Sequence, residues 1–96
     1  MARRQAIAHT IKEKSKLLAR VRRIRGQVEA IERGLDAEIG CSDILQLVAS
    51  VRGAVNGLTA ELFEDHIRDH VLAAKNAEER VAGAEELIDV VRAYLK

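Results

Sequence analysis

Apolar residues recur along most of this chain at spacings of three, four and seven, which is typical of one face of an α-helix and not of a β-strand. The pattern predicts helices over residues 11–35 and 43–73 and a third helix that follows residue 76. The residues expected to be buried are Ile11, Leu18, Val21, Ile24, Val28, Ile31 and Leu35, then Ile44, Val48, Val51, Val55, Leu58, Leu62 and His66, and finally Val81, Ala84, Ile88, Val91 and Leu95. The sequence therefore predicts an all-α protomer of three helices.

Short polar side chains indicate where the second and third helices begin. Ser42 or Asp43 is the expected N-cap of the second helix, and Asp43 with Gln46 approximates a capping box. Asn76 is the expected N-cap of the third helix, with Glu79 three residues further on.

Asn56-Gly57 is a possible turn signal inside the second helix, where it would split the helix into a hairpin. The apolar stripe keeps its helical phase across these two residues, so we favour one continuous helix. Gly53 and Gly57 are one turn apart in that helix. We expect them to be small residues that allow a packed helix to come close.

The composition fits a small helical domain. The chain has 96 residues, with no Pro or Trp, one Phe, one Tyr and one Cys. This length excludes a large two-lobed enzyme, and we expect a flexible basic arm over residues 1–8 and a single three-helix domain over residues 9–96. A single Cys forms no internal disulfide, and no apolar run is long enough for a signal sequence or a membrane span. We expect a cytoplasmic protein that associates with copies of itself to cover its aliphatic faces.

Positive charge is concentrated at the beginning of the chain. Residues 1–25 contain nine Lys or Arg and one acid, whereas residues 26–96 contain seven Lys or Arg and fourteen acids. One face of the first helix carries Lys12, Lys16, Arg20 and Arg23, flanked by Arg22 and Arg25. Because no aromatic residue is interleaved with these cations, we expect duplex DNA bound through its phosphates, and not single strands or RNA. The alternative is a solvated helix whose cations only keep the protein soluble.

A second group of residues has the chemistry of a metal site. His66 and His70 are one turn apart, so both imidazoles can reach one ion. Cys41 comes at the start of the same helix, where free amides and the helix dipole favour a thiolate. A continuous helix separates Cys41 from His66 by about 37 Å, so only an antiparallel second copy brings them together. With His9 as a further candidate, this donor set suits Ni(II), Co(II), Cu or Zn.

Other interpretations of these residues remain open. Cys41 is otherwise a small buried apolar residue, His66 a histidine at the edge of the core, and His70 an exposed residue. A thiol enzyme with Cys41 as nucleophile and His66 as base is another class, but no oxyanion-hole motif or Gly-rich substrate loop accompanies these residues. We therefore expect no enzymatic activity. A purely structural helical assembly leaves the charge asymmetry unexplained.

Four segments of the chain resemble the CsoR/RcnR family of metal- and formaldehyde-responsive transcriptional repressors. They are residues 20–27 (RVRRIRGQ), 51–58 (VRGAVNGL), 64–70 (EDHIRDH) and 91–95 (VRAYL). The likeness extends over residues 9–96. It implies three helices per protomer, an antiparallel four-helix-bundle dimer built on the long second helix, and a flat tetramer that is a dimer of dimers.

The resemblance also implies which residues bind an effector. The ligand cysteine of the family corresponds to Cys41, and the paired positions later on that helix correspond to His66 and His70. Nickel- and cobalt-responsive members add a histidine near the N-terminus, here His9. Copper-responsive members carry a second cysteine at the position of His70, and formaldehyde-responsive members tend to have a proline after the initiator Met; this chain has neither.

The residues that resemble the DNA contacts of the family are Arg20, Arg23 and Arg52, and the basic row adds Lys16 and Arg22. We therefore expect a repressor that binds operator DNA when metal-free. Ni(II) or Co(II) would release it and so derepress a metal efflux gene. The alternative is a formaldehyde-responsive repressor of a detoxification operon, with the cysteine as nucleophile.

Overall fold

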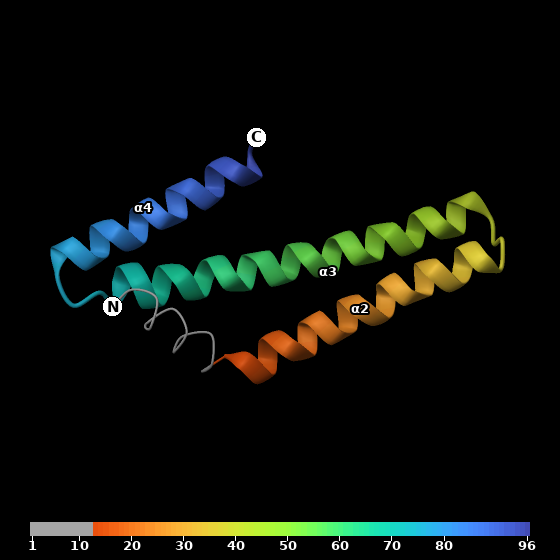
Figure 1. The fold of residues 1–96 in the computed structure, drawn as a ribbon, viewed down its shortest axis with the longest axis horizontal. Helices are drawn as coiled ribbons and strands as arrows, with labels where there is room; N and C mark the ends of the chain where they lie inside the picture. Colours follow the sequence, from red (N-terminus) through yellow and green to blue (C-terminus); the bar gives the residue numbers. More distant parts are fainter. Residues whose placement is uncertain (1–12) are drawn as a thin grey trace. The chain divides into compact units, whose positions relative to one another are not determined.

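The computed structural model of the protein describes residues 13–96. Within this range the chain forms three α-helices, α2 (Lys14–Asp36), α3 (Cys41–Ile67) and α4 (Ala77–Tyr94), as Figure 1 shows. No strand occurs between residues 13 and 96. The predicted all-α class and three-helix protomer are confirmed.

Four expectations from the sequence lie outside the described residues. They are the basic arm over residues 1–8, the candidate ligand His9, the start of the first helix at Ile11 and the first cation of the basic row, Lys12.

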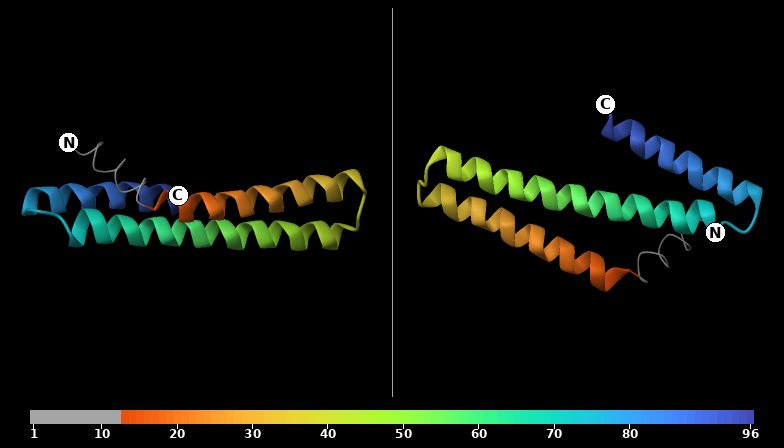
Figure 2. Two further views of the ribbon diagram at one scale, coloured as in Figure 1. Left: turned by 90° about the horizontal axis from the view of Figure 1, so that it is seen from below. Right: turned by 180° about the vertical axis from the view of Figure 1, so that it is seen from behind.

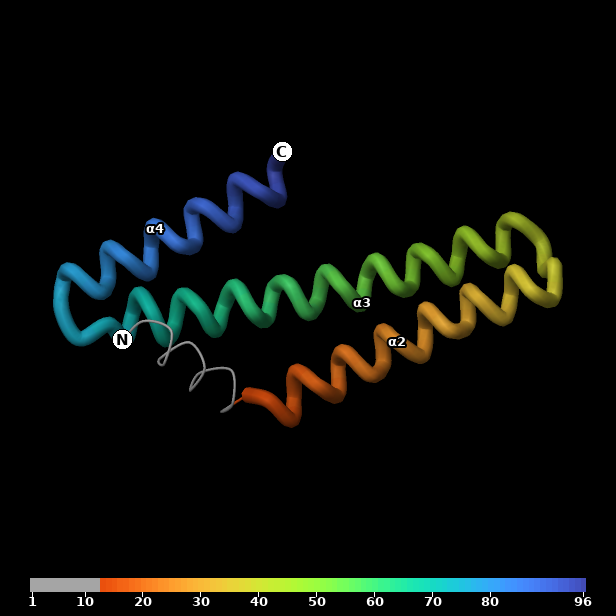
Figure 3. Tube along the Cα trace, in the orientation of Figure 1, coloured from red at the N-terminus to blue at the C-terminus, as the bar shows by residue number. Residues whose placement is uncertain are grey.

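The chain divides into two compact units, and the boundary falls inside α3, between Leu58 and Thr59. In the first unit, α2 and the beginning of α3 form an antiparallel helical hairpin. In the second unit, the end of α3 turns back into α4, and Figures 2 and 3 allow each connection to be followed.

The end of α2 is a compact backbone turn. The N–H of Glu38 donates to the carbonyl of Leu35 at 3.1 Å, and the N–H of Ile39 donates to the carbonyl of Gly34 at 3.1 Å. This pair of bonds is a Schellman motif, in which the residue after the C-cap adopts the left-handed conformation. Glu38 is that residue, with φ of 54°, although Gly is the usual choice there. The turn satisfies carbonyls at the helix end and reverses the chain.

The predicted start of α3 is wrong by two residues. The helix begins at Cys41, because the carbonyl of Gly40 accepts from the N–H groups of Asp43 at 3.0 Å and of Ile44 at 3.1 Å. Gly40 is therefore the cap, and Ser42 and Asp43 lie inside the first turn. In that position the carboxylate of Asp43 still complements the positive end of the helix dipole. The expected capping box of Asp43 with Gln46 does not form there.

The prediction that α3 continues through Asn56-Gly57 is confirmed, since one α-helix extends from Cys41 to Ile67. Beyond Ile67 the chain forms a five-residue π-helix, η1 (Arg68–Leu72). The N–H of Ala73 donates to the carbonyl of Arg68 at 3.0 Å, which is the wider spacing of a π-turn. Short π-helices occur frequently at functional sites, and this one contains His70.

The capping box predicted at the start of α4 is confirmed in the structure. The N–H of Glu79 donates to Oδ1 of Asn76 at 2.8 Å, and the carboxylate of Glu79 accepts from the N–H of Lys75 at 3.2 Å. These bonds satisfy backbone donors that have no partner within the helix.

The far end of α4 is held to α3 by the two benzenoid rings of the chain. The ring of Tyr94 makes an edge-to-face contact with Phe63, with centroids 5.4 Å apart, and its hydroxyl lies 3.3 Å from the hydroxyl of Thr59.

The face of α4 that we expected to be buried is largely exposed. Val81, Ile88 and Leu95 are 54%, 50% and 81% exposed, while Gly83 is buried. Helix α4 thus packs on the rest of its unit through a face that contains Gly83. The stripe predicted from the sequence is apolar, but most of it is exposed in the single chain.

Helices α2 and α3 also expose apolar side chains that we expected to be buried. Exposed valines and leucines include two rows at seven-residue spacing, Val21, Val28 and Leu35 on α2 and Val48, Val55 and Leu62 on α3. Leu17 is the one buried hydrophobic residue among residues 13–96. Rows with this period are the seams through which helices of a bundle pack on one another.

Candidate functional site

The structure brings His66 and His70 together at the junction of α3 and η1. Their ring centroids are 4.8 Å apart, with an angle of 38° between the ring planes. Both side chains are half-buried. The arrangement predicted from the spacing is therefore present, and both imidazoles occupy one small region of the surface.

A hydrogen bond determines which ring nitrogen of neutral His66 carries the proton. Its Nε2 atom lies 2.9 Å from the carbonyl oxygen of Gly83 on α4. A carbonyl oxygen only accepts, so Nε2 is the donor, and in the neutral imidazole the Nδ1 atom then carries the lone pair. Metal-binding histidines commonly have this arrangement, in which one nitrogen donates to a carbonyl and the other binds the ion.

Gly83 also fixes the position of His70. A Cβ atom built on Gly83 would lie 2.8 Å from the carbonyl carbon of His70 and 3.1 Å from its Cβ. The backbone of α4 therefore packs directly on the π-turn, and no side chain fits between them. Gly83 contacts both histidines, a role that the sequence did not reveal, because a single helical glycine carries no signal of its long-range neighbours.

Cys41 is a free, exposed thiol at the first residue of α3. It lies at the opposite end of that helix from His66. Within residues 13–96, no group of three His, Cys, Asp or Glu side chains is placed to hold a metal ion. His9 lies outside the described residues.

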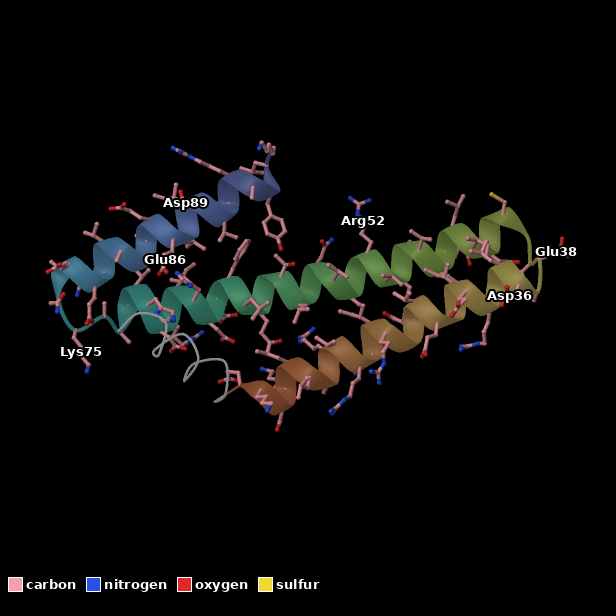
Figure 4. The ribbon with its side chains drawn as sticks, in the orientation of Figure 1. Asp36, Glu38, Arg52, Lys75, Glu86 and Asp89 are labelled. Carbon is pink, nitrogen blue, oxygen red and sulfur yellow. The ribbon has the colours of Figure 1, made fainter. Side chains whose placement is uncertain are left out.

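The predicted DNA-binding cations occupy α2 and α3. Lys16, Arg22 and Arg23 are exposed on α2, and Arg20 is half-buried. No acid occurs in α2 before Glu29, so this stretch of helix is uniformly positive. Arg52 is exposed on α3, and Figure 4 shows its side chain leaving the helix on the side away from α2. By their spacing Lys16, Arg20 and Arg23 share one side of α2, whereas Arg22 lies on another side and Arg52 lies apart from them in this unit.

No helix in the described part of the chain is long and apolar enough to cross a membrane.

Comparison with known proteins places these features in a family. Residues 13–93 match the family described as metal-sensitive transcriptional repressor. An uncharacterised protein from the bioA 5′ region of Serratia marcescens is 50% identical over 91 residues, which cover 94% of this chain and 100% of that protein. The transcriptional repressor RcnR of Citrobacter koseri is 38% identical over 90 residues, covering 94% of this chain and 100% of RcnR.

A solved structure is also similar. It is a variant of the formaldehyde-responsive regulator FrmR from Salmonella enterica serovar Typhimurium, with 45% sequence identity and a TM-score of 0.79. The match covers 86% of this chain and 94% of that one.

Proposed function

Because this chain belongs to the family of metal-sensitive transcriptional repressors, which are not enzymes, we propose that it holds operator DNA when metal-free and is released by Ni(II) or Co(II). Release would derepress a metal efflux gene, and the site of action is the cytoplasm, where the operator is. The observation that carries the choice of effector is the His66 and His70 pair, whose rings are 4.8 Å apart.

The donor chemistry fits a borderline metal ion. His66 offers Nδ1, because its Nε2 is engaged by the carbonyl of Gly83. His70 is its ring neighbour, and Cys41 adds an exposed thiol as a sulfur ligand. Imidazole and thiolate ligands together suit Ni(II) and Co(II), and also Zn or Cu. When bound, the ion would neutralise the thiolate and link residues from separate helix ends.

A metal site made of these residues requires two chains. Cys41 and His66 lie near opposite ends of the 27-residue helix α3, so one chain cannot place both on one ion. An antiparallel dimer would place Cys41 of each chain beside the histidines of its partner, giving two equivalent sites.

The exposed heptad rows support this assembly. Val21, Val28 and Leu35 on α2 and Val48 and Val55 on α3 are each at least 41% exposed. Two copies would bury these rows as a four-helix bundle, which is the expected dimer. The exposed row of α4, with Val81, Ile88 and Leu95, remains for the pairing of dimers into a tetramer.

The basic part of α2 is proposed to bind the DNA. Lys16, Arg20, Arg22 and Arg23 are the contacts to phosphates, and Arg52 adds a cation from the other side of α3. Release by metal is a coupling between two sites, so DNA must weaken metal binding by the same factor by which metal weakens DNA binding.

The direct test uses the purified full chain and a fluorescein-labelled duplex from its own promoter region, read by anisotropy. Ni(II), Co(II), Cu(I), Zn(II) and formaldehyde are titrated separately. We expect release by Ni(II) or Co(II) near one ion per chain, loss of that response in Cys41→Ser and His70→Ala, and an unchanged response in the neighbouring control Glu64→Ala. Failure of the wild type to bind the duplex at low salt contradicts the repressor assignment.

The shared site has its own test. Cys41→Ser and His66→Ala proteins are each expected to bind no metal tightly, whereas a refolded mixture of the two restores one intact site in each mixed dimer. An unrestored mixture contradicts a site built from two chains.

A second effector is favoured by a specific observation. Cys41 is exposed at a helix N-terminus, and a solved relative with 45% identity is a formaldehyde-responsive regulator. If formaldehyde is the effector, Cys41→Ser abolishes release while His70→Ala preserves it. The metal hypothesis requires both residues, so the two variants separate the candidates.

A further inference from the structure

Two side-chain contacts fix how α2 lies against α3 in the first unit. Nε2 of Gln27 donates to the hydroxyl of Ser50 at 3.2 Å. A Cβ atom built on Gly57 would lie 3.1 Å from Nη1 of Arg20. Moving seven residues along α2, from Arg20 to Gln27, moves seven residues back along α3, from Gly57 to Ser50, so both contacts belong to one antiparallel register.

This register defines a surface that spans both helices. Arg20 and Arg23 are on α2, and Ser50, Gly53 and Gly57 follow one another on α3 at spacings of three and four, which place them on one helix face. Gly26 follows Arg23 by three residues and so joins its face. We call these six residues the polar face. The guanidinium of Arg20 already lies over α3 at Gly57, so the positive charge of α2 extends onto its neighbour.

Two glycines of the polar face have no structural explanation within one chain. Gly26 and Gly53 are exposed in the interior of helices, and a Cβ atom added at either would meet nothing within 4 Å. Apart from Pro, Gly is the least favourable residue in a helix interior. Glycine is the usual choice where a ligand comes close to the backbone, and each of these two directly follows an exposed arginine, Arg25 or Arg52.

The apolar rows lie on the other side of the same helices. Val21 and Arg23 are two residues apart, as are Gly53 and Val55, and two residues in a helix correspond to a rotation of about 200°. A second copy that buries the valine rows therefore leaves the polar face open. Two polar faces would also repel each other, because the described part of α2 has no acid before Glu29.

We propose that the sugar-phosphate backbone of duplex DNA lies across the polar face, over α3 as well as α2, with Gly26 and Gly53 at the points of closest approach. The inference rests on the proposed DNA binding and adds to it Ser50, Gly53 and Gly57, on a face of α3 other than that of Arg52. Arg20 and Arg23 contact phosphates, the hydroxyl of Ser50 offers a hydrogen bond, and Gly53 leaves room for a phosphate beside the helix backbone. Added bulk at Gly53 would hold the DNA away from all of them.

The test compares Gly53→Ala and Gly53→Leu with Ala82→Leu, which adds the same final side chain at an exposed position of α4. Anisotropy with the labelled promoter duplex is measured for metal-free protein at several salt concentrations. Thermal unfolding and molar mass in solution are measured on the same samples. Gly53→Ala keeps the test valid if the larger leucine prevents folding.

We expect Gly53→Ala to change thermal stability and DNA affinity in opposite directions. Gly53→Ala raises the melting temperature, because alanine favours helix and meets no atom, yet it weakens DNA binding. Gly53→Leu weakens binding about tenfold or more, the equivalent of one hydrogen bond to a charged group. It also makes the plot of log affinity against log salt concentration less steep, by about one unit for each phosphate that the protein no longer neutralises. We call the steepness of this plot the salt slope. Ala82→Leu leaves the DNA affinity and the salt slope unchanged.

Two results would overturn the proposal. One is a Gly53→Leu protein that binds with wild-type affinity and wild-type salt slope. The other is a changed molar mass of the Gly53 variants in solution, which would assign the polar face to contacts between copies. If the wild type binds and is released by metal while Gly53→Leu binds equally well, only this inference fails. If Gly53→Leu weakens binding but no metal releases the wild type, only the proposed effector fails. A wild type that binds no duplex overturns both.

Discussion

Nε2 of His66 donates a hydrogen bond to the carbonyl oxygen of Gly83 at 2.9 Å, and this contact selects the tautomer of the imidazole. The acceptor is a backbone atom of another helix, so the selection depends on the packing of α4. A histidine with its proton fixed on Nε2 presents Nδ1 to a metal without a change of tautomer. If a metal ion binds here as proposed, this fixed tautomer reduces the rearrangement of the imidazole that binding requires.

The tautomer itself can be observed. Long-range ¹H–¹⁵N correlation spectra of the metal-free protein, at a pH where the imidazole is neutral, are expected to show His66 protonated on Nε2. The reason is that the carbonyl of Gly83 accepts only from a protonated nitrogen. The His66→Gln variant identifies the signals. A spectrum with the proton of His66 on Nδ1 would contradict the contact.

Substitution of Gly83 should be costly. Gly83→Ala places a methyl group 2.8 Å from the carbonyl carbon of His70, so α4 must move away from η1. Overpacking of this kind costs about 1–3 kcal/mol of unfolding free energy. Urea unfolding measures the loss, and metal affinity is expected to fall with it because both histidines shift. Gly26→Ala is the control, since its added methyl meets nothing within 4 Å and should stabilise the helix by about 0.5–1 kcal/mol. Equal stabilities of the two variants would show that α4 does not pack closely on His70.

The valine rows predict which residues form the interface of the proposed dimer. Val55 is 41% exposed in one chain, and a dimer that buries it gains about 1–2 kcal/mol per side chain. Val55→Glu is expected to shift the assembly toward monomers, because a buried carboxylate without a partner is strongly unfavourable. Sedimentation equilibrium over a range of concentrations measures the shift. Leu72→Glu is the matched control, since Leu72 is 73% exposed and lies on neither row. An assembly unchanged in Val55→Glu would move the interface elsewhere.

Tyr94 at the end of α4 makes both an aromatic contact with Phe63 and a hydrogen bond with Thr59, and two substitutions measure these contributions separately. Tyr94→Phe keeps the edge-to-face contact with Phe63 and removes only the hydroxyl near Thr59, so we expect a loss of about 0.5 kcal/mol. Tyr94→Ala removes both and is expected to cost about 0.5–1.5 kcal/mol more. Thermal unfolding gives both values. Equal losses in the two variants would mean that the ring contact contributes nothing.

Local interactions explain the parts of the fold that the sequence predicted well. The continuity of α3 follows from an apolar stripe that keeps its phase through Asn56-Gly57, and the cap at Asn76 follows from side chains three residues apart. The pairing of His66 with His70 needs only helical geometry. The start of α3 was predicted wrongly because Gly40, which follows the turn after α2, provides the first carbonyl in place of a polar side chain.

Tertiary structure decided what no local pattern contains. The stripe of Val81, Ile88 and Leu95 looked like a core face in sequence, yet α4 packs through the face of Gly83, because only a residue without a side chain fits against the backbone of His70. The same packing chose the tautomer of His66. Sequence by itself determined three helices, a positive first helix and paired histidines, since each depends on residues within a few turns of one another. The surfaces those helices leave exposed, and the atoms that the histidines present, depend on contacts between residues far apart in the chain.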